Sequence, residues 1–276
     1  MIVQHNMAAA NTNRQLGITT GSLAKSTEKL SSGYRINRAG DDAAGLSISE
    51  KMRGQIRGLD QASTNAQDGI SLIQTAEGAL QETHSILQRM RELAVQSSND
   101  TNVTADRDSI KAELTSLTDE ITRIATQTEF NTKKLLDGSY SSTVMNFQVG
   151  ANHDQNISLN IKKMSASGLG VQASKVADMV SSYTDATAAI TTINAAITKV
   201  STERSSLGAV QNRLEHTITN ANNTSENLQA AESRIRDVDM AKEMVSYSKS
   251  NILQQAAQSM LSQANQSTQG VLSLLQ

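Results

Sequence analysis

SNILQQAAQSMLSQANQSTQGVLSLLQ, residues 250–276, places apolar or small side chains at alternating spacings of four and three and contains no Asp, Glu, Lys or Arg. This spacing is typical of a coiled coil. A helix facing water would carry Glu and Lys between the apolar positions, because such pairs support it. Their absence indicates a helix surrounded by other protein, where an unpaired charge is costly. The repeat consists of Leu253, Ala257, Met260, Ala264, Ser267, Val271 and Leu274.

The first 24 residues contain one charged side chain, Arg14, and carry a second repeat of seven residues. Its apolar positions are Ile2, Ala9, Leu16, Leu23 and Leu30, and the residues four positions later are Asn6, Asn13, Thr20 and Thr27. We predict that the two ends form helices that pair with one another and drive self-assembly. The expected assembly contacts are Ile2, Leu16, Leu23, Leu30, Leu253, Met260, Val271 and Leu274. Two ordinary amphipathic helices on a globular core are the alternative.

The composition favours long helices over a thick globular core. The chain has no Pro or Trp and only two Phe, and Pro is the residue that breaks helix interiors. Absence of Cys excludes disulfides and thiolate metal sites, and the net charge of −2 argues against nucleic acid as a partner. Gln and Ser interrupt the apolar runs before the ~20 residues of a spanning helix, and Met1–Asn13 lacks the pattern of a signal peptide.

Changes in periodicity divide the chain into segments. After Asp41 and Asp42, which can cap a helix, a helical pattern continues to about Ser98. Thr104 can cap a second helix that continues to about Ile124, and a long final helix is expected over 185–235. Between these helices, 145–149 and 157–161 alternate apolar and polar residues, which predicts a β-hairpin. Within the first long helix we interpret four glycines as places where another helix approaches closely, with a local kink as the alternative: Gly54, Gly58, Gly69 and Gly78.

These segments predict a mainly α fold. We expect a rod of long antiparallel helices with a small β-hairpin patch, and a coiled-coil-like layer formed by both termini. The expected domains are 1–42 and 235–276, which together form the terminal layer, and a helical shaft over 43–234 with its β-patch near 138–170.

Motifs for chemistry are lacking. The four histidines are scattered, and neither a phosphate-binding loop nor a nucleophile motif is present. We therefore expect no enzyme activity, no metal and no cofactor. The region around Arg53 and Arg57 is rich in basic residues, whereas the region around Asp237 and Asp239 is mainly acidic. We predict that these two regions pair by charge, within the chain or between copies.

Several long stretches resemble bacterial flagellin. They are LSSGYRINRAGDDAAGLSISEKMRGQIRGL (30–59), LQRMRELAVQ (87–96), TEFN (128–131), LGAVQNRLEHTI and ESRIRDVDMAKEM, the last two lying within 207–244. The resemblance covers nearly the whole chain. It implies a structural subunit that is exported unfolded through the flagellar type III system, is placed outside the cell, and polymerises into the flagellar filament for motility. The region 138–185 is too short for additional outer domains, so a thin filament is expected.

The resemblance also implies partners and contact residues. In flagellins that the vertebrate Toll-like receptor 5 (TLR5) recognises, the matching contacts are Arg89, Leu93 and Glu113. An export chaperone would bind the C-terminal repeat through Leu253, Met260, Leu261 and Leu274. Filament cap and hook-junction proteins are further expected partners.

Three alternatives to a filament subunit stay open. A hook–filament junction protein of the same superfamily would share the helical ends. An adhesin or signalling ligand is compatible with a filament role. A membrane-active amphipathic helix is disfavoured, because the C-terminal helix lacks a basic face.

Overall fold

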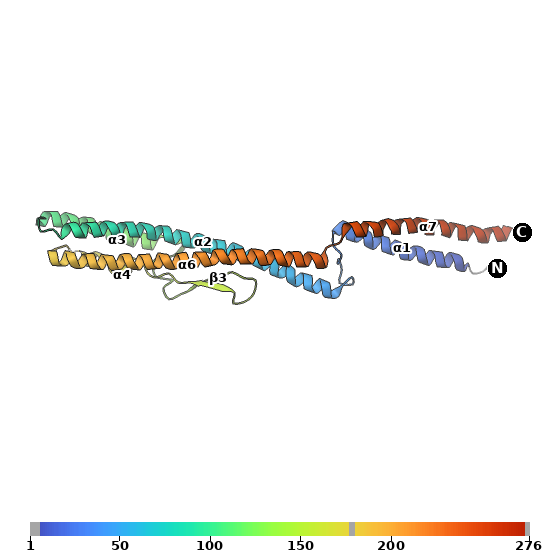
Figure 1. The fold of residues 1–276 in the computed structure, drawn as a ribbon, viewed down its shortest axis with the longest axis horizontal. Coiled ribbons are helices and arrows are strands. Elements are labelled where there is room, and N and C mark those ends of the chain that lie inside the picture. Colours follow the sequence, from blue (N-terminus) through green and yellow to red (C-terminus); the bar gives the residue numbers. More distant parts are fainter. Residues whose placement is uncertain (1–5, 177–179, 274–276) are drawn as a thin grey trace. The chain divides into compact units, whose positions relative to one another are not determined.

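The computed structural model describes residues 6–176 and 180–273, and helices dominate it (Figure 1). In chain order the long helices are α1 (Met7–Ser32), α2 (Ala43–Ser97), α3 (Thr104–Gln127), α6 (Tyr183–Arg236) and α7 (Met240–Ser273). Two short helices, α4 (Ala166–Leu169) and α5 (Ala173–Val176), precede α6. The predicted fold class is confirmed: the chain is mainly α, with long antiparallel helices, a small hairpin and paired terminal helices.

The chain forms two compact units. Met1–Gly54 and Glu226–Gln276 make up the terminal unit, and Gln55–Ser225 makes up the central unit. Both α2 and α6 contribute residues to each unit. The divisions therefore fall inside these two helices. The expected boundaries lie at the first residue of α2 and close to the end of α6, between 234 and 235.

The core of the central unit is built from one apolar stripe on each of α2, α3 and α6. Two polar contacts show that α2 and α6 are antiparallel: Ser225 Oγ donates to Asp60 Oδ1 over 3.0 Å, and Arg204 lies 3.4 Å from Glu77. Because these stripes recur every three to four residues, each helix buries one continuous face. Fully buried members include Ile73, Leu80, Leu87, Leu114, Ile121, Val200, Leu207 and Leu214.

The helix starts agree only partly with the sequence prediction. Asp42 caps α2, because its Oδ1 accepts the N–H of Gly45 over 2.8 Å, as predicted. Thr104 does not cap α3: it is the first helical residue, and Asp106 Oδ2 accepts the N–H of Val103 over 3.3 Å. The Asp of the first turn here accepts the N–H of the residue that precedes the helix, which is one half of a capping box.

The predicted hairpin is present. Strand β3 (Met145–Gln148) pairs antiparallel with β4 (Asn156–Leu159), so that Met145 lies opposite Leu159. A second hairpin, between β1 (Glu129–Phe130) and β2 (Lys133–Lys134), was not predicted. Its strands are too short for a periodic pattern, and its turn places Asn131 and Thr132 at positive φ without the usual glycine.

Two of these four glycines of α2 lie against the hairpin and not against a neighbouring helix. A Cβ on Gly58 would lie 2.8 Å from the Cβ of Ala151, and one on Gly69 would lie 3.1 Å from the ring of Phe147. At Gly54 and Gly78 a Cβ would meet nothing within 4 Å in the part of the chain that the structure describes. The interpretation as helix contacts is therefore wrong, and only two of the four glycines permit a close approach.

Candidate functional site

The terminal helices α1 and α7 pack side by side in the terminal unit (Figure 1). Asn6 Nδ2 donates to the carbonyl oxygen of Ala264 over 3.0 Å, and Gln254 Nε2 donates to Thr20 Oγ1 over 3.4 Å. Because the residue numbers rise along α1 as they fall along α7, the pair is antiparallel. The same Asn6 starts α1, since its Oδ1 accepts the N–H of Ala9 over 3.0 Å.

On α1 the aliphatic repeat faces α7. Leu16, Leu23 and Leu30 are half-buried, whereas the residues expected to accompany them in the seam, Asn13, Thr20 and Thr27, are exposed. The contact with α7 instead includes the residues three positions after the apolar ones, which are Thr12, Thr19 and Ser26. A small rotation of α1 about its axis exchanges these two sets of positions and leaves the leucines facing α7. Thr12 is tolerated there because its hydroxyl donates to the carbonyl of Ala8 over 2.7 Å.

The C-terminal repeat does not form the seam as expected. Ala257 and Ala264 face α1, but Leu253 and Met260 are 48% and 64% exposed. A second series, shifted by one residue, fills the remaining seam positions with Tyr247, Ser250, Gln254 and Leu261. Ile2 and Leu274 lie outside the described residues, and the backbone of Val271 belongs to α7.

This arrangement leaves six bulky apolar side chains of α7 between 48% and 70% exposed. We name them the exposed apolar face of α7: Met240, Met244, Val245, Ile252, Leu253 and Met260. Met244, Val245, Ile252 and Leu253 also line a groove of about 510 Å³, together with Ser248 and Lys249. An exposed apolar patch of this kind marks an interaction surface, because water is a poor solvent for it.

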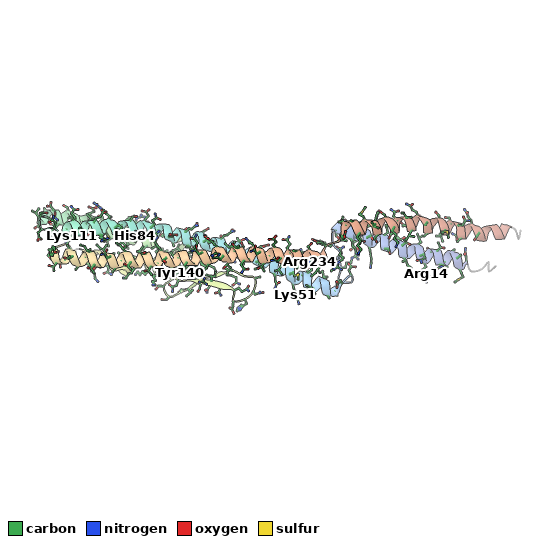
Figure 2. All side chains as sticks on the ribbon, viewed as in Figure 1. Arg14, Lys51, His84, Lys111, Tyr140 and Arg234 are labelled. Carbon is green, nitrogen blue, oxygen red and sulfur yellow. The ribbon has the colours of Figure 1, made fainter. Side chains whose placement is uncertain are left out.

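The partner helix α1 offers few charges to such a surface. Its one charged side chain in the first 24 residues, Arg14, is labelled in Figure 2 and donates to Asn11 Oδ1 over 2.9 Å. Met7 and Ile18 of α1 are 73% and 59% exposed. The terminal unit therefore presents apolar side chains on both of its helices.

Two connectors meet within the terminal unit. The N–H of Arg35 donates to the carbonyl of Arg236 over 2.7 Å, and the N–H of Val238 donates to the carbonyl of Gly33 over 3.0 Å. Arg236 itself is not predictable as a site from its sequence neighbourhood. Its side chain is 12% exposed and donates to Glu50 over 2.8 Å and to Ser49 over 3.2 Å.

A carboxylate stabilises the connector between α1 and α2. Asp41 Oδ2 accepts the N–H of Arg38 over 3.0 Å and that of Asn37 over 3.2 Å. These two hydrogen bonds, first that of Arg38, lower the pKa of the Asp41 carboxyl below its ordinary value of 3.8.

The residues predicted to pair by charge have other partners inside the chain. Arg53 lies 3.6 Å from Glu50, one turn earlier on α2. Asp237 accepts from Ser233 Oγ over 2.6 Å, and Asp239 caps α7 by accepting the N–H of Lys242 over 3.1 Å. Arg57 is exposed on α2. Pairing of these groups between copies stays a prediction.

The three residues matched to receptor binding lie in different environments. Arg89 Nε donates to Glu113 Oε1 over 3.0 Å, and the same guanidinium donates to Glu92 over 3.1 Å. These carboxylates, Glu113 first, raise the pKa of the exposed Arg89 guanidinium. Leu93, in contrast, is only 2% exposed and belongs to the core of the central unit.

A buried glutamate was also missed by the sequence reasoning. Glu203 is 3% exposed, and its Oε1 accepts the N–H of Lys162 over 3.1 Å. It joins α6 to the segment after β4. Its position, three residues after Val200 and four before Leu207 in the buried stripe of α6, is the signal that could have identified it. Among residues 6–176 and 180–273, no group of three potential ligands could hold a metal ion, and no helix could cross a membrane.

Comparison with known proteins identifies the family. The bacterial flagellin N-terminal helical region matches residues 3–141, and the bacterial flagellin C-terminal helical region matches residues 190–275. A flagellin of Halalkalibacterium halodurans is 59% identical, with all of both chains covered. The flagellar filament 33 kDa core protein of Treponema phagedenis is 53% identical, again with all of both chains covered.

A solved structure shares the fold at low identity. A flagellar hook-associated protein from Vibrio parahaemolyticus superimposes with a TM-score of 0.60 and 14% identity, covering 71% of this chain and 100% of that chain. Full-length identity above one half, together with both family regions, settles the relationship. The chain belongs to the bacterial flagellin family.

Proposed function

We propose that this chain is the structural subunit of a bacterial flagellar filament and that it polymerises through the exposed apolar face of α7. The observation that carries the proposal is the exposure of Val245 and Ile252, at 70% and 66%, beside Leu253 and Met260 on a helix already paired with α1. The filament core protein of Treponema phagedenis, 53% identical over its whole length, supports the same role.

The geometry favours an open polymer of identical copies. The outward surfaces of α1 and α7 differ in their side chains, so a contact between them on neighbouring copies would be heterologous. Heterologous contacts that do not close into a ring generate helical filaments. Burial of each half-exposed aliphatic side chain contributes on the order of 1 kcal/mol, and Lys249 is the one charged side chain that lines the groove.

The weakness of the α1–α7 seam supports the proposal that the chain is exported in an unfolded state. Its polar and small members, such as Ser26, Ser250 and Gln254, bury little apolar area. Ordering these helices therefore gains little free energy before assembly. An export chaperone would bind Leu253 and Met260 directly, and would reach Leu261 only after α7 separates from α1. Leu274, the fourth expected anchor, lies outside the described residues.

Filament growth distinguishes this role from that of a hook–filament junction protein. The shared fold with a hook-associated protein supports the superfamily alone. A filament subunit elongates sonicated filament fragments for as long as monomer remains, whereas a junction protein adds a few copies and stops. A filament cap and junction proteins would bind the two ends of the polymer, outside the cell.

The experiment replaces two side chains of the exposed apolar face. The double variant Val245→Ser, Ile252→Ser should elongate seeds at least tenfold more slowly, because about 2 kcal/mol of apolar burial is lost. The matched control is Val95→Ser, Val103→Ser in the other unit, where the valines are 51% and 62% exposed. Electron microscopy and sedimentation measure elongation. Equal elongation rates for the two double variants would contradict the proposed contact.

Recognition by TLR5 is a second candidate function. The exposed ion pair between Arg89 and Glu113 supports it, because a receptor can reach both side chains. Leu93 would act from within the core, by holding the surface of α2 in place. We therefore expect the charged pair to contact the receptor, whereas Leu93 holds the α2 surface that carries Arg89 in its folded position.

A further inference from the structure

The methionines that the structure describes range from buried to exposed, and Met52 and Met145 lie between these extremes. Met240, Met244 and Met260 on α7 are 49%, 48% and 64% exposed. Met90 and Met164, in the core of the central unit, are 0% and 3% exposed. Three of the four exposed methionines among the described residues therefore lie on the exposed apolar face of α7, where they are half of the six bulky side chains. The fourth is Met7 of α1, which is 73% exposed.

We propose that Met240, Met244 and Met260 form an oxidation site at which hydrogen peroxide converts the assembly surface of the monomer into a polar, non-assembling one. The inference rests on the proposed function, because it needs the exposed apolar face of α7 to be a polymer contact. Its chemistry is independent of that function, since it depends on thioether access alone.

The reaction is balanced by peroxide alone. A lone pair of the methionine sulfur attacks one peroxide oxygen, the O–O bond breaks and an S–O bond forms. The thioether is oxidised by two electrons to a sulfoxide, and the peroxide is reduced to one molecule of water after proton transfer between its two oxygens. Neither a metal nor a cofactor is required.

The position of these side chains explains why oxidation would affect assembly. Met244 lines the groove formed with Val245, Ile252 and Leu253. Met260 lies seven residues after Leu253 and therefore on the same side of α7. A sulfoxide is polar and accepts hydrogen bonds from water, so its burial against a neighbouring copy carries a desolvation cost that a thioether lacks.

The groove offers two hydrogen-bond donors to a sulfoxide, Ser248 and Lys249, and four apolar side chains that offer none. Lys249 is the one charged side chain that lines the groove. Its interaction with a sulfoxide oxygen is available in the free monomer as well as in the polymer, so it does not favour assembly. Met240 is the first residue of α7 and follows the segment that pairs with Gly33 and Arg35. Oxidation there changes the surface beside the paired connectors without entering a packed core.

The test treats folded monomer with dilute hydrogen peroxide and quantifies each methionine by peptide mass spectrometry. We expect Met240, Met244 and Met260 to be oxidised at least tenfold faster than Met90 and Met164, which serve as internal controls. The oxidised monomer is then added to filament seeds, and its critical concentration should be at least tenfold higher than that of untreated monomer. Methionine sulfoxide reductases of both stereospecificities should restore growth.

The control is the triple variant Met240→Leu, Met244→Leu, Met260→Leu, which preserves apolar volume without sulfur. It should elongate seeds before and after peroxide treatment at similar rates. Peroxide sensitivity equal to that of the wild type would overturn the proposal by assigning the loss to Met7 or to another group. Normal growth of fully oxidised wild type would overturn it as well. If the triple variant assembles poorly, recovery of growth after reductase treatment of oxidised wild type tests whether methionine sulfoxide causes the loss.

Failure of the two proposals can be told apart. If untreated monomer does not elongate seeds, the proposed filament function is wrong and the inference falls with it. If untreated monomer elongates and the oxidised form elongates equally, only the oxidation site is wrong. Slower oxidation of the three methionines in preformed filaments than in monomer would support both proposals.

Discussion

The guanidinium carbon of Arg236 lies 4.8 Å from the centre of the Tyr34 ring, stacking a cation on an aromatic face within the terminal unit. Tyr34 pairs with Asp237 through an isolated antiparallel bridge. Arg236 thus connects the end of α6, the connector after α1 and, through Glu50, the first turns of α2. A single mostly buried side chain joins three segments that are far apart in sequence.

Replacement of Arg236 by Ala should loosen the two connectors. Loss of the charge-assisted hydrogen bonds and the cation–π contact is expected to cost about 1–2 kcal/mol, because Glu50 is half exposed and partly screened. Hydrogen exchange of the Arg35 and Val238 amides should accelerate by about tenfold or more. Arg38→Ala is the control, since Arg38 is 77% exposed in its pair with Glu28. Equal acceleration in both variants would contradict a special role for Arg236.

The glycines of α2 predict opposite responses to the same substitution. Gly78→Ala should stabilise the central unit by up to about 1 kcal/mol, because Ala is the better helix former and the new Cβ meets open space. Gly58→Ala should be neutral or destabilising, because its Cβ would press on the Cβ and Cα of Ala151. Urea unfolding measures both. Stabilisation of Gly58→Ala equal to that of Gly78→Ala would show that the hairpin does not pack there.

Because Leu93 is buried, we expect its replacement to lower the stability of the central unit and not to remove a direct receptor contact. Leu93→Ala should destabilise the central unit by about 2–5 kcal/mol, since the side chain is buried beside Met90 and Ala94. Val95→Ala, two residues away and 51% exposed, should change stability by less than about 0.5 kcal/mol. Thermal unfolding checks the pair. An unchanged midpoint for Leu93→Ala would place that side chain outside the core.

The receptor contact itself is tested at the ion pair. Arg89→Ala and Glu113→Ala should each lower TLR5 signalling, measured in reporter cells with monomer, while leaving the unfolding midpoint nearly unchanged because both side chains are exposed. Arg123→Ala is the matched control, since Arg123 forms a similar exposed pair with Glu120 on α3. Full signalling by the double variant Arg89→Ala, Glu113→Ala would remove this candidate function.

Acid should loosen the connector at Asp41. The folded-state pKa of Asp41 lies below its unfolded value, because the N–H groups of Arg38 and Asn37 stabilise the carboxylate. Its contribution is therefore complete above about pH 4 and is lost as the pH falls through the lowered folded pKa. Amide exchange at Asn37 and Arg38, corrected for intrinsic rates, should report this loss. The Asp41→Asn variant should show faster exchange at neutral pH and a weaker pH dependence.

Much of the fold was accessible from the sequence because it rests on local periodicity. The stripes that include Leu87, Leu114 and Leu207 recur at helical spacing and are buried as that spacing implies. The alternation around Phe147 and Ile157 likewise identified the paired strands. The hairpin at Asn131 escaped prediction, because two-residue strands carry no period and its turn contains no glycine.

The assembly surface could be predicted only in part. Heptad spacing in α1 identifies Leu16, Leu23 and Leu30, but two partner series, three or four residues away, are equally compatible with it. Sequence spacing cannot choose between them, since a helix rolls by one residue at little local cost. Packing of α1 against α7 makes the choice: Ser26 is buried and Thr12 and Thr19 are half-buried, whereas Asn13, Thr20 and Thr27 of the other series are exposed.

The sequence by itself determined the family, the order of helices and hairpin, and the scarcity of charge at both ends, because these depend on residue identity and on spacing along one segment. Tertiary structure alone decided that Leu253 and Met260 face outward, that Leu93 faces inward, and that Arg236 lies on Tyr34. Those outcomes depend on which residues of distant segments meet. A helix carrying two apolar stripes can bury only one of them against a single partner, and the other remains available to the next copy.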